Sequence, residues 1–157
     1  MAFVLDGFAN ATEVIAGRSV GKNDQQQLKQ GFIIAAIWSL ILASLFSLIY
    51  FLFGPQIISL LTSIPEVNAT ANTYLVWLII MPLVSVWSYL LDGLFIGTTR
   101  SKEMRNTMLF STFICFLPAW YLLQPLANHG LWLALLLFLA ARGISQSIYL
   151  PKILQLK

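Results

Sequence analysis

The sequence of residues 90–106 is LLDGLFIGTTRSKEMRN, a stretch in which a long apolar run carries one acid, Asp92, and then ends in a basic cluster. A carboxylate at the centre of a membrane helix costs about 2.5 to 3.5 kcal/mol, so such a residue usually faces a polar path or a charged partner. The stretch therefore predicts a membrane helix that carries a functional acid.

The motif around this acid occurs twice. Residues 5–8 are LDGF and residues 91–94 are LDGL, and an Arg-Ser pair follows each copy, at residues 18–19 and 100–101. Because one predicted span separates the two copies, we expect both helices to cross the membrane in the same direction. Asp6 lies farther from its arginine than Asp92 does, so Asp6 is expected to be the deeper acid.

The composition predicts an integral membrane protein. The chain has 157 residues, of which 59% are hydrophobic and 10% charged, and its mean hydropathy is +0.81. A soluble domain needs more charge to cover its surface, so we expect an all-α, polytopic helix bundle in a lipid bilayer. The net charge of +3 comes from Lys and Arg in short loops or near helix ends, which indicates topology and not nucleic-acid binding. The single cysteine, Cys115, offers neither a disulfide nor a zinc cluster.

We expect four full spans and the end of a fifth, since a bilayer core of about 30 Å needs roughly 20 apolar residues of helix. The full spans are predicted at 32–53, 72–99, 107–126 and 131–150, and the partial span at 1–17. The connections at 54–71 and 127–130 contain no Lys or Arg, so the positive-inside rule predicts a cytoplasmic C-terminus. The short first span predicts that the chain begins partway through a longer protein.

Four prolines refine this layout. Pro55 and Pro65 are expected to bracket the outer loop, in which residues 56–64 are too short to span and predict an interfacial helical turn. Pro82 and Pro118 lie inside spans and predict kinks, which membrane helices tolerate.

A polar stripe on the first helix is a candidate ion or substrate path. Asp6, Asn10, Glu13 and Gly17 are spaced so that they share one helical face. Such a stripe can line a water-filled cavity, in which a partly desolvated carboxylate carries a proton or coordinates a cation. In the alternative, Asp6 only caps or pairs within the bundle.

A second candidate wall lies on the predicted span at 72–99. Ser85, Ser88, Asp92 and Thr99 share a face, with Tyr89 beside Asp92. The alternative, which we weigh equally, is that Asp92 bonds locally while Gly93 and Gly97 let two helices approach closely. No permanent metal site is expected, although a transient Na⁺ contact near Asp92 or Glu13 stays open.

Two other polar residues receive structural interpretations. Arg142 is expected to extend toward the cytoplasmic end of the last span, because it lies only some 12 Å from the helix end. His129, in Asn-His-Gly at 128–130, is expected to be a polar turn residue between two spans.

Three segments resemble a known family. Residues 5–17 (LDGFANATEVIAG), 89–106 (YLLDGLFIGTTRSKEMRN) and 128–135 (NHGLWLAL) are similar to the multidrug and toxic compound extrusion (MATE) transporters, and most closely to their DNA-damage-inducible (DinF) subgroup. The resemblance covers the whole chain in order and is to the C-terminal part of the family's members. It implies that residues 1–157 form a partial C-terminal six-helix lobe, from the end of the eighth helix through the twelfth.

The resemblance also implies a function. Members of the family are antiporters and not enzymes, use no cofactor, and export amphipathic or cationic compounds in exchange for H⁺ or Na⁺ by alternating access between two lobes. We therefore expect a multi-pass protein of the bacterial inner membrane that is inactive without its N-terminal lobe. The candidate path residues are Asp6, Asn10, Glu13, Ser88, Tyr89 and Asp92.

Two rival functions remain open. One is a structural or inert product of a truncated gene. The other is an intramembrane aspartyl protease, which needs two acids that share a proton, but neither Asp6 nor Asp92 has the Gly-x-Gly-Asp context of that class.

Overall fold

The computed structural model describes residues 2–155, with side chains from Leu5 onward, and all its secondary structure is helical. Its elements in chain order are α1 (Ala2–Gly21), α2 (Gln25–Leu61), α3 (Pro65–Gly97), α4 (Ser101–Phe110), the π-helical segment Ser111–Phe116, α5 (Leu117–Leu122), the 3₁₀ turn Gln124–Leu126, α6 (Ala127–Ser147) and α7 (Leu150–Ile153). The predicted all-α membrane helix bundle is confirmed.

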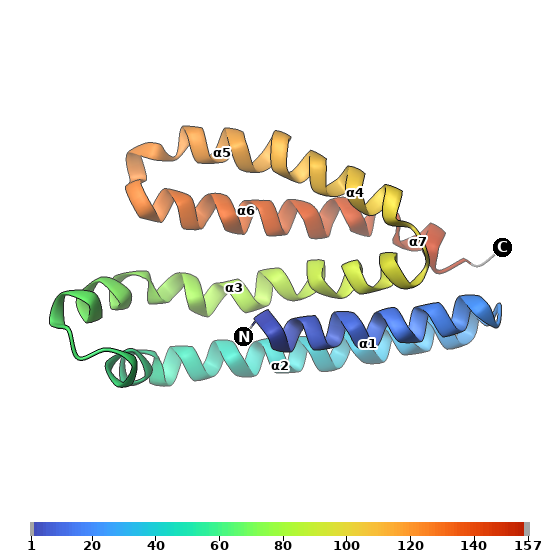
Figure 1. Cartoon of the computed structure of the whole chain (residues 1–157), viewed down its shortest axis with the longest axis horizontal. Coiled ribbons are helices and arrows are strands. Elements are labelled where there is room, and N and C mark those ends of the chain that lie inside the picture. Colours follow the sequence, from blue (N-terminus) through green and yellow to red (C-terminus); the bar gives the residue numbers. More distant parts are fainter. Residues whose placement is uncertain (1, 156–157) are drawn as a thin grey trace.

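Helix α3 is the centre of the bundle. Helices α1 and α2 pack against one side of it and α6 packs against another, while α4 and α5 form an antiparallel pair with α6 (Figure 1). Short α7 closes one end, where buried Ile153 joins the apolar core formed by Leu28, Phe32 and Phe95. Two groups of helices, α1–α3 and α4–α6, therefore meet mainly along α3 and α6.

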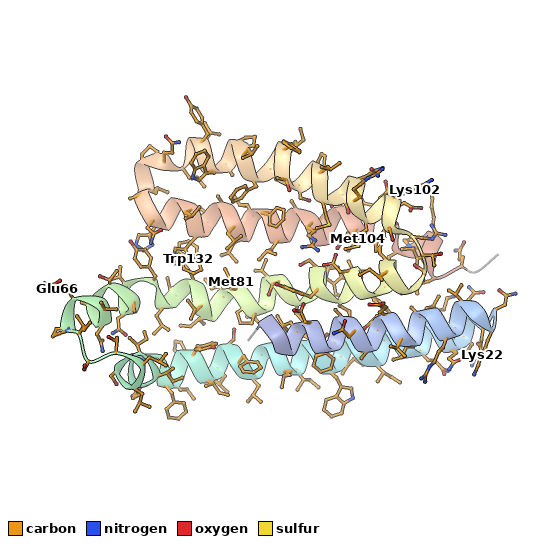
Figure 2. All side chains as sticks on the ribbon, viewed as in Figure 1. Lys22, Glu66, Met81, Lys102, Met104 and Trp132 are labelled. Carbon is orange, nitrogen blue, oxygen red and sulfur yellow. The ribbon has the colours of Figure 1, made fainter. Side chains whose placement is uncertain are left out.

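The charges are distributed unequally between the two ends of this bundle. Lys22 and Lys102 lie at the end that α7 closes, whereas Glu66 lies at the other (Figure 2). We call the first the basic end; it comprises the α1–α2 and α3–α4 connections and α7, with Arg18, Lys22, Lys29, Arg100, Lys102, Arg105 and Lys152.

The predicted outer loop at 54–71 is wrong. Helix α2 continues through Gly54 and Pro55 to Leu61, and α3 begins at Pro65, so only residues 62–64 connect them. Pro55 removes one backbone donor but does not stop the helix, and Pro65 sits in the first turn of α3, where a missing N–H costs nothing. At 37 residues, α2 is about 56 Å long, well beyond the thickness of a bilayer core.

Three helical stretches are long and apolar enough to cross a membrane by length and composition: Gln25–Leu61, Pro65–Gly97 and Gln124–Ser147. They contain most of the predicted spans at 32–53, 72–99 and 131–150. The predicted span at 107–126 instead coincides with α4, the π-helical segment and α5, a helical run whose hydrogen-bond pattern changes before Pro118. Many large apolar side chains on the outer faces are exposed, including Trp38, Phe51 and Ile144, as expected for surfaces that face lipid.

Candidate functional site

The polar stripe of α1 lies outside the packed interior. Asp6 and Asn10 are exposed and Glu13 is half-buried. The packed face of α1 carries buried Leu5, Thr12, Ala16 and Ser19. Asp6 lies 15 residues before the end of α1, about 22 Å from the basic end, so its carboxylate is near the middle of the bundle.

The acid of the second motif has a different environment. Asp92 is buried, with 8% of its surface exposed, and lies only about 8 Å from the end of α3. The Nη2 group of Arg142 donates to its Oδ2 atom and pairs with it, and Gln146 Nε2 donates to its Oδ1 atom at 2.7 Å. Both donors come from α6. Because each carboxylate oxygen already has a donor, this geometry does not favour a shared proton of the aspartyl-protease type.

The interpretation of Arg142 as a residue that extends to the cytoplasmic end is wrong. Its guanidinium turns toward α3, and only 13% of the side chain is exposed. A carboxylate and a guanidinium that face each other in an apolar bundle stabilise one another more than either is stabilised by reaching for distant water. Sequence analysis missed the pair because the residues are 50 positions apart, although Arg142 and Gln146 share a helical face.

Ser88 and Tyr89 lie near Asp92 on α3 without joining its hydrogen bonds. Ser88 is fully buried, and its hydroxyl donates to the backbone oxygen of Ser85 at 2.9 Å. Tyr89 is half-buried and packs against a small apolar cluster of Leu5, Ala43 and Val86. The structure thus divides the six candidate residues into an exposed group on α1 and a largely buried group on α3.

The two glycines of the second motif bring α1 and α3 together. A Cβ atom on Gly93 would lie 2.0 Å from the backbone oxygen of Ala9, and one on Gly97 would lie 2.4 Å from that of Glu13. Only glycine permits this approach, as at the small-residue contacts of other membrane helices. The alternative interpretation is therefore met in part. Gly93 and Gly97 let α1 and α3 approach closely, but Asp92 bonds to side chains of α6 and not locally.

His129 is not a turn residue, because α6 already begins at Ala127. Its Nδ1 atom accepts a hydrogen bond from Trp77 Nε1 at 3.0 Å, and its ring lies 4.7 Å from the ring of Tyr74. The three side chains join α6 to α3 at the end of the bundle opposite the basic end. Asn-His-Gly favours a turn by local propensity, but the contact with α3 places the histidine in the first turn of a helix.

A shallow groove of about 570 Å³ between α1 and the start of α2 is lined by Ile15, Asp24, Gln26, Gln27, Gln30, Gly31 and Ile34. None of the six candidate residues contributes to it. Asp24 there serves as the N-cap of α2, accepting a hydrogen bond from the backbone of Gln27 at 2.8 Å. Across residues 2–155, no three His, Cys, Asp or Glu side chains gather as a metal site would require.

Comparison with known proteins bears on the resemblance that the motifs suggested. The family model described as MatE matches residues 1–122. DNA damage-inducible protein F of Escherichia coli (strain K12) is 48% identical over 144 residues, which are 92% of this chain and 31% of that protein, so the chain spans about a third of the relative's length. No solved structure gives a significant match. Because the family model covers most of the chain, this protein belongs to the MATE family of multidrug-efflux transporters.

Proposed function

We propose that this chain forms the C-terminal bundle of a cation-coupled multidrug antiporter, which exports amphipathic or cationic compounds in exchange for H⁺ or Na⁺. The observation that carries the proposal is the polar face of α1, where Asp6, Asn10 and Glu13 project from the bundle of a MATE-family chain. In an apolar helix, side chains of this kind need a polar path or a partner.

The packing of α1 supports this choice of face. Backbone contacts through Gly93 and Gly97 hold the helix tightly on α3, so its buried face is fixed. Asp6 and Asn10 remain exposed on this fixed helix, while Glu13 is half-buried beside α3. In a transporter with a second bundle, that exposure suits a cavity between the two bundles, where water lowers the cost of the carboxylates and a cationic compound can bind them.

The charge distribution supports an orientation in the membrane. By their places in the chain, seven of the Lys and Arg residues belong to the basic end. Lys22 and Lys102 are seen there in Figure 2, with Glu66 at the other end. The positive-inside rule then places the basic end, and with it α7 and the C-terminus, on the cytoplasmic side of the bacterial inner membrane. Asp6 is near mid-membrane in this orientation, which is the depth at which transporters place their sites.

Transport is proposed to require more than these 157 residues. The chain spans about a third of the E. coli relative, and alternating access needs one bundle to rock against another around the site. In the proposed mechanism this bundle supplies one wall of the cavity, and a second bundle supplies the other. We therefore expect no transport by the isolated chain in liposomes.

A chimera tests the proposal directly. The 48% identity allows residues 1–157 to replace the matching segment of the E. coli protein, and everted vesicles then report the uptake of a fluorescent cationic dye. We expect uptake by the chimera when a proton or sodium gradient is imposed, and none by the isolated chain or by the E. coli protein without the segment. A chimera that is inserted in the membrane yet transports nothing contradicts the proposal and favours the inert gene product.

A further inference from the structure

The contact between α3 and α6 is a buried polar seam. It contains Ser88 and Asp92 from α3 and Gly143 and Gln146 from α6, all of them buried. A Cβ atom on Gly143 would lie 3.2 Å from the ring of Trp87 and 3.7 Å from the backbone nitrogen of Ser88, so the two helices are close here. Polar groups enclosed at such a contact form interhelical hydrogen bonds because lipid offers them no alternative partner.

The seam has an internal counter-ion. Arg142 supplies the positive charge that buried Asp92 requires, and Gln146 binds the other carboxylate oxygen at 2.7 Å. No other acid or base is paired within this seam among the described side chains; the other ion pair, Arg100 with Glu103, is half-exposed at the basic end. A free cation that came to bind Asp92 would therefore have to displace a guanidinium held by the same protein.

The position of the pair gives it a mechanical consequence. Helices α1 and α2 touch α3, and α4 and α5 touch α6, so the seam is the main junction between the two groups of helices (Figure 1). An ion pair across this junction resists sliding of one group past the other. Together with the other contacts between α3 and α6, that resistance helps the bundle to rock as one body.

We infer that Asp92, Arg142 and Gln146 form a fixed clamp that positions α6 on α3, and that Asp92 is not an exchangeable site for the coupling ion. The clamp follows from the contacts alone, whereas the statement about the coupling ion rests on the proposed function. Arg142 and Gln146 are thus positioning residues. The guanidinium of Arg142 is the permanent counter-ion of Asp92, so Asp92 does not exchange a cation during transport.

The clamp is tested on the purified 157-residue chain, without any transport assay, by thermal unfolding in detergent. Asp92→Asn and Arg142→Gln each leave one buried charge without its partner. At the midpoint temperature of the unchanged chain, each is expected to lower the ratio of folded to unfolded protein about tenfold or more. The double variant removes both charges and is expected to regain most of the loss. An asparagine at position 92 can also donate to Oε1 of Gln146, which lacks a donor among the described residues.

Matched controls separate this effect from a general effect of charge removal. Glu103→Gln and Arg105→Gln make the same kinds of chemical change at the basic end. Glu103 belongs to a half-exposed ion pair, and Arg105 is exposed. We expect both to unfold as the unchanged chain does. If the single variants cannot be purified, recovery of the double variant supports the clamp, and failure of the double variant overturns it.

Ion addition provides the opposing test. If Na⁺ raises the midpoint of the unchanged chain, and Asp92→Asn removes that shift while Arg142→Gln enlarges it, Asp92 is an exchangeable ion site and the inference is overturned. Equal midpoints for the unchanged chain and the single variants overturn it as well. A chimera that fails to transport refutes the proposed function but leaves the thermal result of the clamp intact.

Discussion

Gly93→Ala is the substitution whose cost can be worked out most closely from the structure. The added Cβ atom would lie 2.0 Å from the backbone oxygen of Ala9 and 2.7 Å from its carbonyl carbon. Ordinary contact begins at 3.4 Å, and the obstacle is backbone and not a side chain that can rotate, so α1 as a whole must move away from α3. Overpacking of this kind costs about 1 to 3 kcal/mol.

The gain in helix propensity opposes this cost, and a matched control isolates it. Alanine is favoured over glycine in a helix by about 0.8 to 1 kcal/mol. At Gly17 of α1 a Cβ atom would meet its nearest neighbour, the Gly97 oxygen, at 3.5 Å, so Gly17→Ala receives the gain without the clash. Thermal unfolding should place Gly93→Ala about 3 to 10 °C below Gly17→Ala. A Gly93→Ala midpoint equal to or above that of Gly17→Ala would refute the close packing of α1 on α3.

The remaining predictions concern contacts and strain elsewhere in the chain. His129→Phe retains an aromatic ring but removes the acceptor of the Trp77 N–H, so it should cost about 0.5 to 1.5 kcal/mol, and Trp77→Phe should add little to it in a double-mutant cycle. Thr99 has φ of 58°, which a β-branched residue rarely adopts, so Thr99→Gly should raise the free energy of unfolding by about 1 kcal/mol. Asn23→Gly, at φ of 54°, should gain less because asparagine tolerates this region. Ile153→Ala removes a side chain that is 1% exposed and should destabilise the chain by about 2 to 5 kcal/mol, measured by the same unfolding assay.

The sequence predicted the helices well and their ends poorly. Hydropathy is a sum over some 20 residues, so it located the centres of long helices such as α2 and α3. Their ends depend on local features that hydropathy does not contain. Pro55 predicts the start of the outer loop, yet α2 accommodates the missing N–H of this proline and continues to Leu61.

The candidate site shows the same division between local and distant information. The α1 stripe follows from helical spacing alone, and the structure keeps Asp6, Asn10 and Glu13 off the packed face. The partner of Asp92 could not be found that way, because Arg142 lies 50 residues later and meets it only when α6 packs on α3. A buried acid and an equally unusual arginine in another apolar helix were nevertheless a signal that the two belong together.

The most direct test compares coupled dye transport by the chimera carrying Glu13→Gln with transport by the chimera carrying both Asp92→Asn and Arg142→Gln. If the acids of α1 contact the ion or the substrate and the Asp92 clamp only positions helices, Glu13→Gln lowers coupled transport about tenfold or more, while the double variant stays close to the unchanged chimera. Membrane insertion of each chimera is checked by immunoblot. Normal transport with Glu13→Gln, together with loss of ion coupling in the double variant, contradicts this assignment and returns the ion site to Asp92.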